Sequence, residues 1–246
     1  FEGTAEAGIG GQGTIKNVEM ILVTTNGSTN ATVAAATIGG GAVAVNAGMA
    51  LGINRTNIKT YIGDGVTIVN KPGVGTHITL NTDFTANLNA IIISVTGGMV
   101  AVGVSVAVAI NKAEAYTYMG ADPKNPSSEY AVGKGTINVD HIIINSKFKV
   151  NTTVAGFSVA VGGVAVNGLV ALGFNRIINV TGVSRANVTA KTLDIDGIIE
   201  GKTEVAGISV IGGFVAVGAT VAVAQIDTSN LAMIDTTNGI INVETL

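Results

Sequence analysis

The fold of this chain is decided by residues 100–110, which read Val100-Ala101-Val102-Gly103-Val104-Ser105-Val106-Ala107-Val108-Ala109-Ile110. Large β-branched residues hold every even position, and very small residues hold every odd one. Successive side chains of an extended strand point to opposite faces, so this alternation predicts a strand. On a helix the same spacing would not gather the large residues on one side. Residues 215–224 repeat the pattern.

Charge is absent from four stretches, 20–54, 84–111, 150–175 and 205–226, and all 13 basic and 16 acidic residues lie outside them. Hydropathy alone would make these stretches membrane helices. Their density of Val, Thr and Gly disfavours helix, the flanking charges are mixed in sign, and there is no aromatic belt. Membrane-spanning β-strands are also an alternative, because eleven alternating residues match the ~9–11 residues of such a strand. A barrel lumen should be polar, however, and here the small-residue face is Ala and Gly.

The composition favours a core of thin aliphatic layers. Aromatic residues are 4% of the chain, Trp is absent, and Gly reaches 34 of 246 residues. There is no cysteine, so the hydrogen-bond ladder and the core must hold the fold without disulfides. A net charge of −3 with no basic run argues against nucleic acid as a partner. Because the chain starts at Phe1 without a basic n-region, we expect it to be a piece of a longer polypeptide.

Each uncharged stretch contains a glycine pair followed by an alternating run. The large residues change parity across the pair, which predicts a corner between two faces of a coil, built with dihedrals that glycine allows. The first glycines of successive pairs lie 57, 65 and 50 residues apart, and a solenoid tolerates such variation because each coil touches only its neighbours. The pairs are Gly40-Gly41, Gly97-Gly98, Gly162-Gly163 and Gly212-Gly213.

A polar residue follows each glycine pair by about a dozen residues. It is Asn54, Asn111 and Asn175 in the first three repeats and, one position shifted, Asp227 in the fourth. In parallel stacking these asparagines would align along the axis. We expect them at equivalent corners, in the left-handed conformation, hydrogen-bonded in a column.

The predicted fold is all-β: one right-handed parallel β-helix, or β-solenoid. We divide it into four degenerate repeats at 1–64, 65–120, 121–183 and 184–246. With ~20 residues per coil, each repeat would hold two to three coils and the chain about a dozen, giving a rod near ~60 Å long. The valines would fill the interior. The Ala, Gly and Ser residues would then form an outer strip, able to contact another rod or to lie under a loop.

The usual signs of catalysis are missing. No nucleophile elbow, P-loop or metal-ligand pair is present, and His77 and His141 read as strand residues on a solvated face. Gly10-Gly11-Gln12-Gly13 resembles the start of a calcium-binding nonapeptide but lacks its Asp, and Asp64 reads as a turn residue. We therefore expect no enzyme activity, no cofactor and no metal.

Two sequence units carry a resemblance to a known family. They are Gly97-Gly98-Met99-Val100-Ala101-Val102, followed by Asn111-Lys112, and Tyr61-Ile62-Gly63-Asp64-Gly65-Val66-Thr67-Ile68. Together they resemble the repeats of leukotoxin-type filamentous adhesins, large haemagglutinin-like exoproteins of Gram-negative bacteria. The resemblance implies a β-helical passenger, secreted or held at the cell surface, that an outer-membrane partner exports by two-partner secretion. It covers scaffold positions only and implies no catalytic residue.

The leading functional hypothesis is a structural and adhesive segment that contacts a host-cell surface or matrix. Stacked coils would form the stalk, and charged loops such as Ala121–Lys134, with Pro123 and Pro126, would meet partners. One alternative is a membrane-active cytotoxin segment, favoured by the long apolar strands. A second is a polysaccharide-degrading β-helix enzyme, for which Asp194 and Asp196, on one strand face near Glu200, would be the acids.

Overall fold

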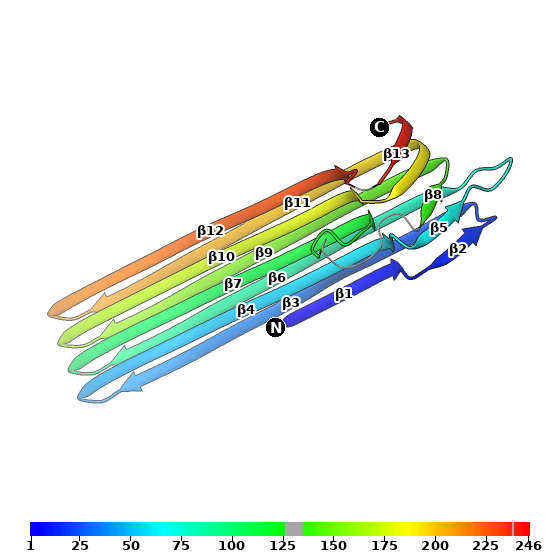
Figure 1. Ribbon diagram of the computed structural model, residues 1–246. Helices are drawn as coiled ribbons and strands as arrows, with labels where there is room; N and C mark the ends of the chain where they lie inside the picture. Colours follow the sequence, from blue (N-terminus) through cyan, green and yellow to red (C-terminus); the bar gives the residue numbers. More distant parts are fainter. Residues whose placement is uncertain (126–134, 238) are drawn as a thin grey trace.

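The computed structural model describes residues 1–125, 135–237 and 239–246, and the regular elements in these ranges are all strands (Figure 1). Seven of these strands are 21 residues long, which is three to four times the usual length of a strand. The strands are β1 (Glu2–Ile9), β2 (Gly13–Lys16), β3 (Met20–Gly40), β4 (Val43–Gly63), β5 (Val66–Val69), β6 (His77–Gly97), β7 (Val100–Gly120), β8 (Thr136–Asn138), β9 (His141–Val161), β10 (Val164–Ser184), β11 (Asn187–Gly212), β12 (Val215–Asp235) and β13 (Ile241–Thr245).

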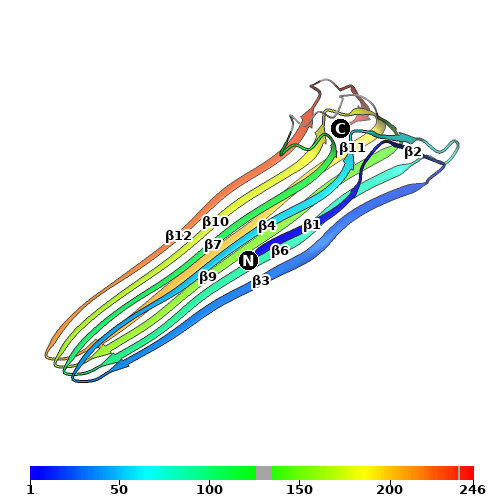
Figure 2. The same cartoon turned by 60° about the horizontal axis from the view of Figure 1, so that its bottom comes forward.

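The strands form two parallel sheets. Sheet A has the order β1-β4-β7-β10-β12, and sheet B has the order β2-β5-β8-β11-β9-β6-β3, with β13 beside β11. Each long strand of sheet B leads through a two-residue turn into a long strand of sheet A, which packs against it. The result is a stack of long β-arches, whose turns align at one end of the molecule and whose short strands and loops lie at the other (Figure 2).

The predicted β-solenoid class is confirmed, but the predicted coil size is wrong. His77 pairs with Met20, His141 with His77, and Thr192 with His141, so successive coils are offset by 57, 64 and 51 residues. Each repeat is therefore one coil, and the chain holds about four coils rather than a dozen. The stack is only ~20 Å deep along its axis, whereas a 21-residue strand extends ~70 Å across it. The molecule is a long slab.

The unequal offsets arise at the loop end. In the third coil the short strand runs directly into the next long strand, giving the 26-residue β11. Elsewhere a loop separates the two, as at 70–76 between β5 and β6. The loop predicted to meet partners, 121–134, is described only up to Asn125, and 126–134 lie outside the described residues.

The valine-rich strands face the opposite way from the prediction. Ala101 and Ala107 of β7 are fully buried, whereas Val100 and Val104 are 37% and 46% exposed. The small residues fit a narrow gap, because sheet B supplies the bulk with residues such as Leu88 and Ile92. The expected interior of valines and the expected outer strip of Ala, Gly and Ser are therefore wrong. In β7 these small residues are buried, so they offer no outer strip for a contact between rods.

The interior is also more polar than the prediction allowed. Thr60 donates to Thr25 Oγ1 at 2.8 Å and lies 2.7 Å from Thr82 Oγ1, which lies 2.6 Å from Thr117 Oγ1. The hydroxyls form a continuous row across both sheets. A larger aliphatic core closes the loop end, around Ile62, Leu80, Met119, Ile142 and Val183. The slab thus has a hydrophobic interior at its loops and a thin, partly polar interior toward its turns.

Candidate interaction surfaces

The predicted glycine pairs lie where each strand of sheet B turns into sheet A. The aligned positions of the turns are Gly41, Gly98, Gly162 and Gly213, since each of the last three has the carbonyl of the preceding one directly beside it. A Cβ on Gly98 would come within 2.1 Å of the Gly41 carbonyl oxygen. Stacking of the turns, more than unusual dihedrals, therefore requires glycine here. The other members of the pairs are Gly40, Gly97, Gly163 and Gly212.

The predicted corner asparagines are not at corners. Asn54, Asn111 and Asn175 are buried in the middle of β4, β7 and β10, in register with one another. Asn54 Nδ2 donates to Asn111 Oδ1 at 3.1 Å, which is the expected column bond. Asn175 instead donates to the carbonyl of Lys202 at 2.9 Å, and accepts from Thr152. The left-handed conformation occurs at Asn17 and Arg185 among the described non-glycine residues, and not at these asparagines.

The outer face of sheet A is apolar over the half nearest the turns. Its positions stack residue for residue, as in the row Val43, Val100, Val164 and Val215. Five more such rows follow along the outer face, and the last of them contains Ile53 of β4. Gln225 is the single polar residue in these five rows. The exposed large residues of this face are Val43, Val45, Met49, Leu51, Ile53, Val100, Val104, Val164, Val166, Val215, Val217, Val221 and Val223.

Sheet B and the turns continue this apolar surface. Sheet B exposes large apolar side chains over its last seven residues before the turn, and Met99 (74% exposed) and the fully exposed Phe214 project from the turns themselves. We call the combined surface of both faces and the turns the apolar end. Its exposed members on sheet B are Ile38, Ile91, Ile93, Val95, Phe157, Val161, Ile208 and Val210.

A row of cations borders the apolar end on sheet A. Arg55, Lys112 and Arg176 lie in register on the outer face, directly after the last apolar row. Arg55 makes an exposed ion pair with Glu2 at 3.3 Å, while Lys112 and Arg176 form no ion pair with another described residue. The fourth member of the row is Asp227. The row therefore presents a positive edge where the apolar surface stops.

Sheet B carries a polar surface at the corresponding level, which we call the asparagine shelf. Asn87 Nδ2 donates to Asn30 Oδ1 at 2.6 Å, and Asn151 Nδ2 donates to Asn87 Oδ1 at 2.8 Å. This amide ladder lies in an open depression of about 700 Å³, whose other walls include Lys149 and Glu200. Amides and paired charges in such a depression can form hydrogen bonds to a polar ligand such as a glycan.

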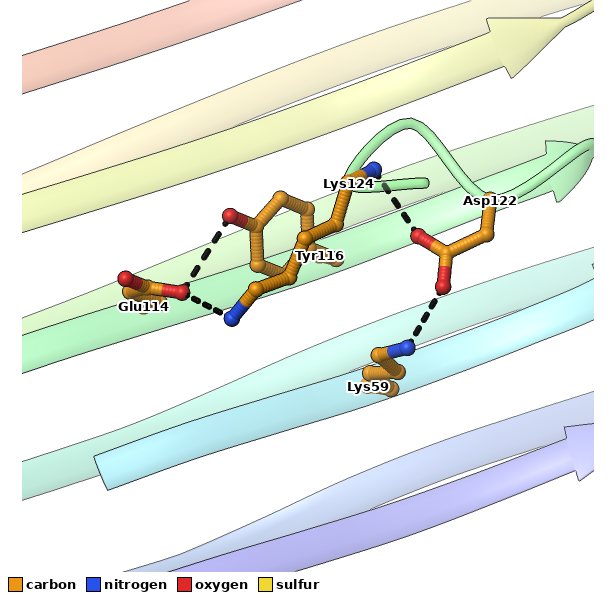
Figure 3. Close-up of polar contacts among 5 residues, drawn as sticks. All are labelled: Lys59, Glu114, Tyr116, Asp122 and Lys124. Carbon is orange, nitrogen blue, oxygen red and sulfur yellow. Dashed lines mark hydrogen bonds and ion pairs between the residues drawn. The ribbon is translucent and has the colours of Figure 1, made fainter. Parts of the chain in front are cut away.

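Residues 121–125 pack against part of the polar half of sheet A, on β4 and β7 (Figure 3). Lys59 Nζ lies 2.5 Å from Asp122 Oδ2, and Lys124 forms an ion pair with Glu114. Lys124 also lies over the ring of Tyr116, with Nζ 5.5 Å from the centroid. Burial and the neighbouring Glu114 carboxylate together raise the pKa of Tyr116 to about 12. These contacts hold the start of the loop against the sheet.

The remaining candidate residues do not assemble into a catalytic or metal site. His77 and His141 pair in register with ring centroids 4.6 Å apart at the loop end, and His141 Nδ1 lies 2.7 Å from Thr192 Oγ1. Asp194 and Asp196 share the outer face of β11, as predicted. In the described ranges no three His, Cys, Asp or Glu residues gather in a way that could hold a metal ion.

The search for relatives and for membrane helices gave negative results. No family model matches the chain, and neither a curated protein nor a solved structure matches it. Over the part of the chain that the structure describes, no helix has the length and hydropathy needed to cross a bilayer.

Proposed function

We propose that this chain is a structural and adhesive repeat segment of a large secreted or surface-exposed filamentous protein. The observation that carries the proposal is the unbroken register between coils, in which 21 consecutive residues of β7 pair with 21 of β4 and 21 of β10. A coil that contacts only its neighbours can be repeated without changing the rest of the stack. Such a scaffold suits a long projecting stalk.

The adhesive part of the proposal rests on the asparagine shelf. Its amides come from three successive coils, so a chain of stacked coils would offer a polar row along its axis. A repeated row of hydrogen-bonding groups suits repeated ligands such as surface glycans or matrix fibres, to which many weak contacts add up. Host cells or matrix are therefore the proposed partners. An outer-membrane secretion partner follows from the adhesin resemblance.

The test is binding of the purified segment to cultured animal cells and to immobilised extracellular matrix. The key variant is Asn87→Ala combined with Asn151→Ala, which removes the ladder from the depression. The matched control is Asn81→Ala with Asn145→Ala, an in-register pair on the same two strands nearer the loops. We expect the shelf variant to lose binding and the control to keep it. If the unaltered segment binds neither surface, the adhesive role is rejected and only the stalk remains.

A further inference from the structure

We infer that the apolar end inserts into the hydrocarbon of a lipid bilayer, with the turns leading and sheet A tilted toward the membrane. The inference names a lipid surface as a partner. It does not depend on the adhesive proposal, because it rests on a different part of the molecule. Its evidence is the distribution of apolar side chains, the polar interior behind them, the length of the apolar rows and the cations at their border.

The apolar residues surround the end of the slab. A flat partner, or a second copy lying face to face, would cover one sheet and leave the other in water. Here large side chains are exposed on sheet A, on sheet B and at the turns, where Met99 and Phe214 project and are not covered by any of the described residues. Exposed apolar patches of this extent mark interaction sites. A surface that is apolar on all sides fits an apolar medium better than a single docking partner.

Several polar groups of this end are inside and bonded to one another, whereas the buried hydroxyls of Thr37, Thr96 and Ser105 have no partner among the described residues. Asn46 Nδ2 donates to Ser94 Oγ at 3.2 Å. Ser158 Oγ donates to Asn167 Oδ1 at 2.7 Å, and Asn167 Nδ2 donates to Ser209 Oγ at 2.8 Å. Apolar residues outside and hydrogen-bonded polar residues inside are the arrangement of a protein surface that faces lipid. Insertion would therefore leave these interior bonds in place.

The lengths of the apolar rows fit a tilted insertion. On sheet A the apolar outer face runs from Val43 to Ile53, or ~33 Å, whereas on sheet B it runs from Ile91 to Gly97, or ~20 Å. Half of the hydrocarbon core of a bilayer is ~15 Å thick. Both faces can thus bury their turns within one leaflet. The longer row on sheet A indicates that this face leans onto the membrane.

The cation row supplies charge complementarity to that orientation. Arg55, Lys112 and Arg176 stand where the apolar face of sheet A ends, so they would reach the headgroup phosphates as the apolar rows enter. Basic residues near an anionic membrane surface strengthen binding, and their long stems can extend along apolar surface. We therefore expect tighter binding to anionic vesicles than to neutral ones.

Insertion also has a cost at the edges of the stack. At the apolar end four strands have an unpaired edge among the described residues: β4 and β12 in sheet A, and β3 and β11 in sheet B. Unpaired backbone groups are unfavourable in hydrocarbon. Tilted insertion into one leaflet keeps the loop-side half of each edge in water.

Single fluorophores can test the inference, because the chain contains no cysteine. An environment-sensitive NBD group is attached to Phe214→Cys at a turn and to Val74→Cys in the exposed loop at the far end. A matched pair, Val108→Cys and Asn89→Cys, places it eight residues from the turn on opposite faces. The probes are vesicles of phosphatidylcholine, alone or mixed with phosphatidylglycerol. We expect a blue shift at Phe214→Cys, a smaller one at Val108→Cys, less at Asn89→Cys and none at Val74→Cys.

Charge variants give the second measurement. The pair Met99→Glu and Phe214→Glu should weaken partitioning into vesicles by at least about tenfold, while Val74→Glu leaves it unchanged. Lys112→Gln with Arg176→Gln should weaken binding to anionic vesicles by roughly 30-fold and spare neutral ones. All variants substitute exposed side chains, and circular dichroism checks their folding.

The result that overturns the inference is a Phe214 label that stays in water with both kinds of vesicle. If the mass of the protein doubles in solution at the same time, the apolar end is covered by a second copy instead. The vesicles hold no protein and no glycan. A failure to bind lipid is therefore distinct from a failure of the adhesive proposal, which the cell and matrix assay measures.

Discussion

Gly98 lies directly against the Gly41 carbonyl of the preceding coil, and a Cβ at Gly98 would come within 2.1 Å of that oxygen. The same relationship recurs one coil later, where a Cβ on Gly162 would come within 2.3 Å of the Gly98 carbonyl oxygen. The turns therefore stack as closely as the strands do. Glycine at this position fixes the spacing of the coils at the end where no large core holds them.

We expect Gly98→Ala to destabilise the stack by about 2–4 kcal/mol, because the added methyl group must displace backbone. The neighbouring Gly97→Ala is the matched control, since a Cβ there meets no atom within 4 Å. Its effect should be within about 1 kcal/mol. Urea denaturation followed by circular dichroism measures both. Equal midpoints for the two variants would show that the turns can separate without cost.

The buried asparagines give a second prediction. Asn111→Ala removes the acceptor of Asn54 Nδ2 inside the slab, so it should cost about 1–3 kcal/mol, the penalty of an unsatisfied buried amide. Asn89→Ala is the control: its amide donates to Thr32 Oγ1 on the outer face, in contact with water. The free energy of unfolding of this control should stay within about 0.5 kcal/mol of the unaltered chain. If Asn89→Ala lowers the free energy of unfolding as much as Asn111→Ala does, burial of the Asn54–Asn111 hydrogen bond gives it no special role in stability.

A third prediction concerns alkaline pH. Burial raises the pKa of Tyr116 from 10.0 to about 12, so the folded state holds the phenol proton more tightly than the unfolded chain does. This contribution to stability is complete below pH 10 and is lost as the pH rises toward 12. Urea midpoints measured across that range should fall, and Tyr116→Phe should lessen the fall. Part of the fall should remain in Tyr116→Phe, because burial also raises the pKa of Tyr118. If the urea midpoint of Tyr116→Phe falls with pH as steeply as that of the unaltered chain, the Tyr116 phenol does not contribute to the fall.

Much of the fold is readable from the sequence, because period-two alternation survives in every long strand. The coil size is not, because the repeat spacing alone does not distinguish one long coil from several coils of ~20 residues. The alternation of buried and exposed positions in β4 in fact continues for most of its 21 residues without a turn. The run contains no Pro, and its alternation continues past Gly48 and Gly52, which indicates one long strand. Loops of different length then account for the unequal repeats.

The direction of the faces could also have been read from parity. Lys112 and Glu114 are even-numbered, like the valines of β7, and a charged residue on the same face places that face toward water. Asn111 shares its parity with Ala107 and marks the inner face. The apolar end follows from the same parity. The narrow gap between the sheets admits mainly small side chains from sheet A, so the large side chains of that sheet face outward.

Because the small residues of β7 face inward and its valines face outward, a charge should be costly at a small residue and tolerated at a valine. Ala107 is fully buried beside Ala50 and Leu88, so Ala107→Glu places an unpaired charge among buried apolar side chains and should cost more than about 4 kcal/mol. Val104→Glu adds the same charge three residues away on the outer face and should change the free energy of unfolding by less than about 1 kcal/mol. Thermal unfolding and oligomer size measure both. A folded, soluble Ala107→Glu beside an unfolded Val104→Glu would mean that the two faces of β7 are reversed.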